Sequence, residues 1–221
     1  MELILTPWHA PPDLVSPSHQ LIGLTLVITG VFAGFIHRVG TPLTYNYMTV
    51  NQRNVVKFLM EGLRFAAEAR GSLRDDELLS FIFQTVECGH HTVKPQAEQG
   101  YLLRGMRELL DHYRLAVIGG WKISSEWSTH ALEFLKSGMR AAIGRKWCIA
   151  DKGSVGIVPG SATSGAHIVI FDGFPLPFVL KSHSESESTS YRLAGHGYFH
   201  DLEEQIESSR EELDHRKIFI K

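Results

Sequence analysis

The stretch from Gly153 to Ser182 limits the possible fold more than any other part of this sequence. It places three short apolar runs between turns that contain glycine or proline: 155–158, 167–171 and 178–181. Runs of this length between such turns are typical of short β-strands. Asp172-Gly173 is a strong hairpin signal, and Pro177 indicates an edge position or an extended start for the next strand. We therefore predict a β-meander.

Further segments extend this pattern. Runs at 147–150 and 191–193 predict flanking strands, and 218–220 a possible last strand. The apolar segment 21–36 has sixteen residues, fewer than the roughly 20 that a membrane helix needs. Its valine, isoleucine and threonine content and its internal glycines favour a buried strand over 21–38. No basic stretch precedes it, so a signal peptide is not expected either.

Helical patterns occupy the middle of the chain. Apolar residues recur at helical spacing over 51–69, 75–86 and 96–117. Ser124 or Ser125 can cap a fourth helix, with Leu132, Leu135 and Met139 on one face. The predicted class is therefore α+β: an N-terminal strand, a four-helix layer, and an antiparallel β-meander that forms a curved sheet or half-barrel. We expect an extended arm over 1–20 and one domain over 21–221.

Composition excludes several function classes. The 22 basic and 24 acidic residues are scattered, so we expect no nucleic-acid partner. Two cysteines, Cys88 and Cys148, in a chain of this size are typical of reduced thiols and predict a cytoplasmic protein. The sequence contains no phosphate loop, dinucleotide fingerprint or nucleophile elbow, so we expect no cofactor. The oligomeric state is left open.

The densest group of polar aromatic residues ends the meander. In a strand, His196, Tyr198 and His200 share one face because side chains alternate. If this face lines a cavity, the three residues are candidate catalytic proton donors. The alternative is that Gly195 and Gly197 mark a bulge and that the rings pack on the sheet or lie at the surface.

Other residues are candidates for substrate binding. Lys181 ends an apolar run and is suited to holding a carboxylate, although a solvated strand end is the simpler interpretation. Trp121, Trp147 and Phe171 offer large apolar walls, a role that competes with ordinary core packing. Cys88, His90 and His91 lack companion ligands at metal-site spacing, so we predict no metal site.

The meander resembles the C-terminal region of fungal heterokaryon-incompatibility (HET) proteins. The resemblance covers roughly 20–200. After a first strand, LVITGVFAGFIHRVG, it is carried in order by Gly144-Arg145, Asp151-Lys-Gly153, Val155-Gly-Ile-Val-Pro159, Gly165, Pro177-Phe-Val-Leu-Lys181, Tyr191-Arg-Leu-Ala-Gly195 and Gly197-Tyr-Phe-His200. The sequence departs from the family pattern at Ala166, at His196 and after His200. In that family a signalling domain lies upstream; this sequence leaves no room for it, so we expect a stand-alone module.

Two functions follow as expectations. The first is a cofactor-free enzyme of fungal secondary metabolism, a pericyclase of the Diels–Alder type that closes a ring in a hydrophobic terpenoid or polyketide intermediate. Such a reaction needs a shaped apolar cavity and one or two hydrogen-bond donors. The second is a non-catalytic interaction or regulatory module related to heterokaryon incompatibility. The polar loop 182–190 is a candidate lid in the first case.

Overall fold

The structure, a computed structural model, describes residues 19–22, 25–44, 52–71, 74–88, 96–119, 128–174, 176–183, 190–202 and 215–221. The predicted α+β class is confirmed. The helical elements are α1 Gln52–Arg70, α2 Asp75–Val86, α3 Gln96–Gly119, α4 Thr129–Glu133, the π-helical turn Phe134–Gly138 and the 3₁₀ turn Arg140–Ala142. The strands are β1 His19–Ile22, β2 Thr25–Val39, β3 Arg145–Ala150, β4 Val155–Pro159, β5 His167–Phe171, β6 Pro177–His183, β7 Ser190–His196, β8 Tyr198–Phe199 and β9 His215–Ile220.

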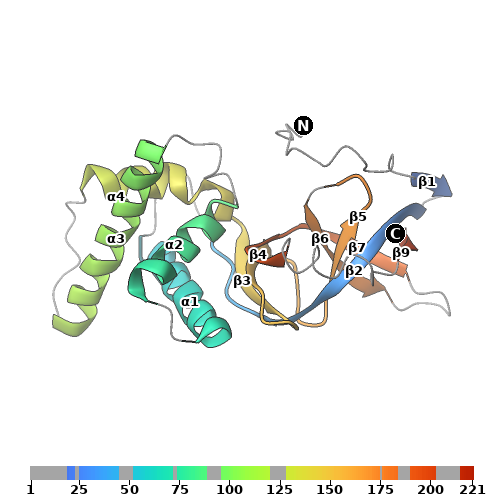
Figure 1. Cartoon of the computed structure of the whole chain (residues 1–221), viewed down its shortest axis with the longest axis horizontal. Coiled ribbons are helices and arrows are strands. Elements are labelled where there is room, and N and C mark those ends of the chain that lie inside the picture. Colours follow the sequence, from blue (N-terminus) through green and yellow to red (C-terminus); the bar gives the residue numbers. More distant parts are fainter. Residues whose placement is uncertain are drawn as a thin grey trace.

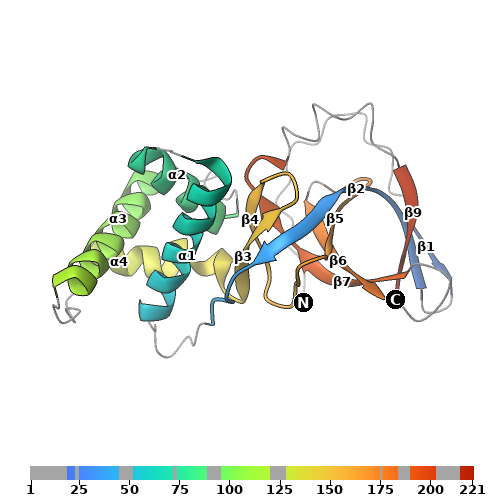
Figure 2. The ribbon, with the colours of Figure 1, turned by 90° about the horizontal axis from the view of Figure 1, so that it is seen from below.

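The helices gather at one end of the molecule and most strands at the other, with β3 and β4 between them (Figures 1 and 2). Strand pairing closes a ring at the strand end. β5 pairs with β6, β6 with β7, β7 with β9, β9 with β2, and β2 again with β5. All of these pairings are antiparallel except β7 with β9, which is parallel. The curved sheet that the sequence predicts therefore returns to its N-terminal strand.

The long strand β2 joins this ring to a second group of strands. Beyond its ring pairings it continues into a pairing with β3, and β3, β4 and β8 follow one another in antiparallel order. Glycine allows the crossing, because a Cβ on Gly34 would lie 2.4 Å from Oδ1 of Asp151 and its φ is +154°. The apolar 21–36 segment is thus β-strand where it is described, and no helix of the described part has the length and apolarity to span a bilayer.

Three clusters of buried side chains fill the spaces between these layers. The ring cluster lies inside the ring and comprises Ile28, Val169, Phe171, Leu180, Ile218 and Ile220. The middle cluster lies between the ring and β3–β4–β8, and it includes Ile36, Cys148, Val158, Ile168, Val179 and Phe199. The helix-side cluster joins α1, α2 and α3 to the opposite face of β3 and β4. Alternation along β3 and β4 explains how one pair of strands serves two clusters.

The hairpin prediction at Asp172-Gly173 is confirmed by the antiparallel pairing of β5 with β6. Gly173 has a φ of +80°, and the Phe174 amide donates to the Phe171 carbonyl at 3.0 Å. Pro177 is the first residue of β6 and lies opposite Ile170. The prediction of an edge strand at this proline is wrong, because β6 pairs with strands on both sides. The alternative, that Pro177 begins the strand in an extended conformation, is what the structure has.

The fourth helix differs from its prediction. Its N-cap is Ser128, whose hydroxyl accepts from the Ala131 amide, while Ser124 and Ser125 lie outside the described residues. Leu135 and Met139 are buried, but Leu132 is 39% exposed. The buried face consists of Ala131, Phe134, Leu135, Gly138 and Met139, so Leu132 lies at its edge. The helix ends in a π-helical turn, in which the Met139 amide donates to the Phe134 carbonyl.

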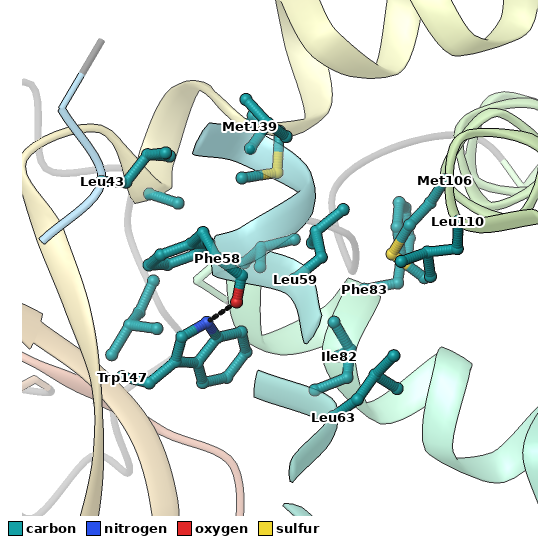
Figure 3. Close-up of a cluster of buried hydrophobic side chains, with 14 of the residues drawn as sticks. Leu43, Phe58, Leu59, Leu63, Ile82, Phe83, Met106, Leu110, Met139 and Trp147 are labelled. Carbon is teal, nitrogen blue, oxygen red and sulfur yellow. Dashed lines mark hydrogen bonds between the residues drawn. The ribbon is translucent and has the colours of Figure 1, made fainter. Parts of the chain in front are cut away.

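Trp147 anchors the helices to the sheet (Figure 3). Its side chain is fully buried, and its Nε1 donates to the Phe58 carbonyl on α1 at 2.8 Å. The centroids of the Trp147 and Phe58 rings lie 5.3 Å apart. The indole rests directly on the backbone of α1 at Gly62, where an added Cβ would lie 2.3 Å from a ring carbon. Only glycine permits this approach.

We therefore predict opposite effects for two glycine-to-alanine substitutions in helices. Gly62→Ala should lower the free energy of unfolding by about 2 kcal/mol because Trp147 must move. Gly100→Ala, in α3 with nothing near the added methyl group, should raise it by about 0.5–1 kcal/mol. Urea denaturation measures both values, and equal changes in the two variants would contradict the proposed packing.

Candidate functional site

The structure does not bring the predicted site residues together in one place. His196, Tyr198 and His200 lie where the end of the meander meets β3, β4 and α2. Trp147 belongs to the helix-side cluster, Phe171 to the ring cluster, and Lys181 extends from the strand that carries Val179 of the middle cluster. Trp121 lies outside the described residues, as do 184–189 of the proposed lid.

His196 is held by Arg145, the first residue of β3. The guanidinium donates through Nη1 to the His196 carbonyl at 2.8 Å, and Nη2 lies 2.5 Å from the ring Nε2. A guanidinium has only donors, so Nε2 is the acceptor and the ring proton lies on Nδ1. The arrangement gives His196 a fixed tautomer and orients it towards the start of β3. It also occupies the nitrogen that a general base needs.

Tyr198 and His200 pack against the helical layer. Tyr198 is half-buried beside the helix-side cluster and lies opposite Ile157 of β4. The His200 ring meets the Phe81 ring of α2 edge-on, at 4.8 Å between centroids. These two residues of the expected face contact the helical layer, whereas the third, His196, is held at the start of β3 by Arg145.

A cation–π contact and an ion pair complete this junction. The Arg70 guanidinium at the end of α1 lies 4.3 Å from the Phe81 ring centroid and forms an ion pair with Asp201. Phe81 therefore contacts both Arg70 and His200, and its ring joins α1, α2 and the end of β8. Contacts of this kind fix the meander against the helices.

The bulge that belonged to the alternative interpretation of this segment is present in β7. The pairing with β6 shifts after Leu193, leaving Ala194 without an opposite residue. Gly195 has a φ of +133°, and the Gly197 amide donates to the Pro177 carbonyl at 2.8 Å. This bulge ends β7 at His196 and begins β8 at Tyr198, so it turns the chain from the ring to the second group of strands.

Lys181 has a cationic neighbour that the sequence interpretation missed. Lys146 on β3 is only 8% exposed, and burial, followed by the charge of Lys181, lowers the pKa of its ammonium. The alternation of side chains along β3 could have indicated that Lys146 points inwards. It shares a face with Cys148 and Ala150, which are both in the middle cluster. Arg145 was missed as a partner of His196, because they are far apart in sequence and no local pattern links them.

Neither cysteine has the environment of a nucleophile. Burial raises the pKa of the Cys88 thiol to about 11, and it also raises the pKa of the Cys148 thiol, which lies in the middle cluster. Within the described ranges no three His, Cys, Asp or Glu side chains are placed to hold a metal ion. His90 and His91 lie outside those ranges.

Comparison with known proteins gave no match, whether to a protein-family model, to a curated protein or to a solved structure. The resemblance to the HET C-terminal region accordingly remains a proposal that rests on the motifs of the sequence.

The raised pKa values predict slow thiol chemistry in the folded protein. At about pH 8 a thiol with a pKa of about 11 is ionised in roughly one molecule in a thousand, against about one in four for an ordinary cysteine. Ellman's reagent should therefore modify the native protein far more slowly than a small-molecule thiol, and both cysteines should react once urea unfolds the chain. Rapid labelling of native Cys88 would contradict this environment.

Proposed function

We propose that this domain is a non-catalytic interaction or regulatory module related to the C-terminal region of HET proteins. The observation that supports it most is the dispersion of the expected site. His196 is engaged by Arg145, His200 by Phe81, and the expected walls Trp147 and Phe171 are core residues of different clusters. An enzyme of the expected kind needs these groups around one substrate.

The dimensions of the ring support the same proposal. A barrel of about eight strands has an interior that side chains just fill or that holds one small ligand, and the diameter falls with the number of strands. This ring has five, and Phe171 and Phe178 lie inside it with 4.9 Å between their ring centroids. The ring is thus better suited to presenting an outer surface than to enclosing a guest molecule.

Large apolar side chains remain exposed on the strands. Phe35, Leu193 and Phe219 are 45%, 49% and 43% exposed, on β2, β7 and β9 respectively. Aromatic and aliphatic side chains of this size are the usual anchors of protein interfaces. Leu193 lies opposite Leu180 of the ring cluster, whereas Phe219 stands between Ile218 and Ile220 of that cluster and therefore points outwards. Phe219 on the outer face is the first candidate for contact with a partner.

The pericyclase stays as a second proposal, favoured by one observation. Tyr198, whose phenol is a hydrogen-bond donor, lies next to the apolar helix-side cluster. A donor beside an apolar wall is what polarisation of an electron-poor alkene requires.

Affinity purification from the source cells tests the first proposal. We expect a partner protein to be recovered with the wild-type chain and with His196→Phe. We expect its recovery to fall about tenfold or more with Phe219→Ser, because loss of an apolar anchor at a hot spot weakens an interface by about 2 kcal/mol. Equal recovery with all three proteins, or with none, would contradict the proposed surface.

Ligand screening separates the two proposals. A terpenoid or polyketide intermediate that binds the folded state raises the melting temperature by mass action. The interaction module predicts no such shift and no turnover. A shift accompanied by turnover that falls in His196→Phe and Tyr198→Phe, but not in the control Tyr101→Phe on exposed α3, would establish the enzyme instead.

A further inference from the structure

A row of basic side chains crosses the outer face of β6 and β7 and leads towards β3. Lys181 lies directly opposite Arg192, and directly opposite residues of an antiparallel pair share a face. Arg192 Nη2 is 3.4 Å from Nε2 of His183, two residues along β6 on the same face. At the other end of the row is Lys146, whose pKa is lowered in part by the charge of Lys181.

The strands place Lys146 and Lys181 on facing surfaces. Two residues before Lys181, Val179 enters the middle cluster; two residues after Lys146, Cys148 enters the same cluster. Alternation therefore directs both lysines into the gap between β3 and β6, at the edge of that cluster. Like charges in such a position repel each other, and the cost is greatest for the nearly buried Lys146.

No acidic side chain in the described part of the chain forms an ion pair with Lys146, Lys181 or Arg192. The stem of Lys146 is buried, and a lysine in such a position extends its ammonium group towards solvent, where an external anion can reach it. The row is therefore a concentration of positive charge that an external anion would compensate.

We propose that Lys146, Lys181 and Arg192 form a binding site for the oxyanionic group, carboxylate or phosphate, of a small ligand. Arg192 is exposed and Lys181 half-exposed, so the row leads from the surface to Lys146. The Arg192 guanidinium supplies a planar pair of donors, and the two ammonium groups supply compact charges on the inner side. The site goes beyond the proposed function because it requires neither a protein partner nor catalysis.

The length of the row and the overall charge favour a small ligand over nucleic acid. The chain carries a formal net charge of −2, and the row involves only three fully charged side chains. Nucleic-acid binding normally requires a broader basic surface.

The test is a titration of the full chain with inorganic phosphate and, separately, with citrate, followed by NMR of 13C-labelled lysine side chains. We expect saturable shifts of the Lys146 and Lys181 signals with one anion or both, and the anion that binds more tightly identifies the oxyanion. Lys146→Met and Lys181→Met should each weaken binding by about tenfold or more, since hydrogen bonds to charged groups contribute strongly. Lys217→Met, an exposed position on β9 with the same loss of charge, is the control and should leave the affinity within about twofold.

A second measurement guards against a folding defect. Far-ultraviolet circular dichroism should show Lys181→Met to be folded, since its side chain is half-exposed. Binding should also raise the pKa of Lys146, because a bound anion favours the charged ammonium. The proposal is overturned if neither anion produces saturable shifts at millimolar concentration, or if Lys217→Met weakens binding as much as the two site variants.

Discussion

The contact between Trp147 and α1 is the interaction on which the rest of the structure depends. A fully buried indole donates to the Phe58 carbonyl and rests on Gly62, so it fixes both the distance and the rotation of the helix over β3. Buried aromatic side chains of this size dominate core energetics, and a satisfied indole N–H removes the cost of burying a polar group. Once β3 is fixed in this way, its opposite face can pack only against the ring.

The two-sided character of β3 and β4 follows from that anchor. Trp147 and Ile157 face the helices, while Cys148 and Val158 face the middle cluster. Strands that are buried on both faces need apolar residues, and these two strands have charged side chains only at Arg145 and Lys146, at the start of β3. Arg145 is engaged by His196, whereas Lys146 faces the ring beside Lys181, where we propose the anion site. The position of β3 between the helices and the ring therefore also places Lys146 at the proposed binding site.

Local pattern predicted the elements well and their assembly only in part. The α2 prediction over 75–86 agrees with the observed helix, because its apolar spacing is local information. Ring closure depends on β9 pairing with β2, nearly two hundred positions away in sequence, which no local pattern reveals. For the same reason alternation could place Tyr198 and His200 on one face, but only tertiary packing decides that this face meets the helices. Lys181 was found from its position at a strand end, whereas its neighbour Lys146 required the fold.

Native-state hydrogen exchange of wild type and Trp147→Leu tests directly whether this anchor joins helices and sheet into one cooperative unit. The account predicts that the substitution lowers the free energy of exchange by about 3 kcal/mol, and by the same amount in the amides of α1, β3 and the ring strand β5. If α1 alone loses protection while β5 keeps its wild-type value, the two parts are independent and Trp147 is not the interaction that holds the fold together.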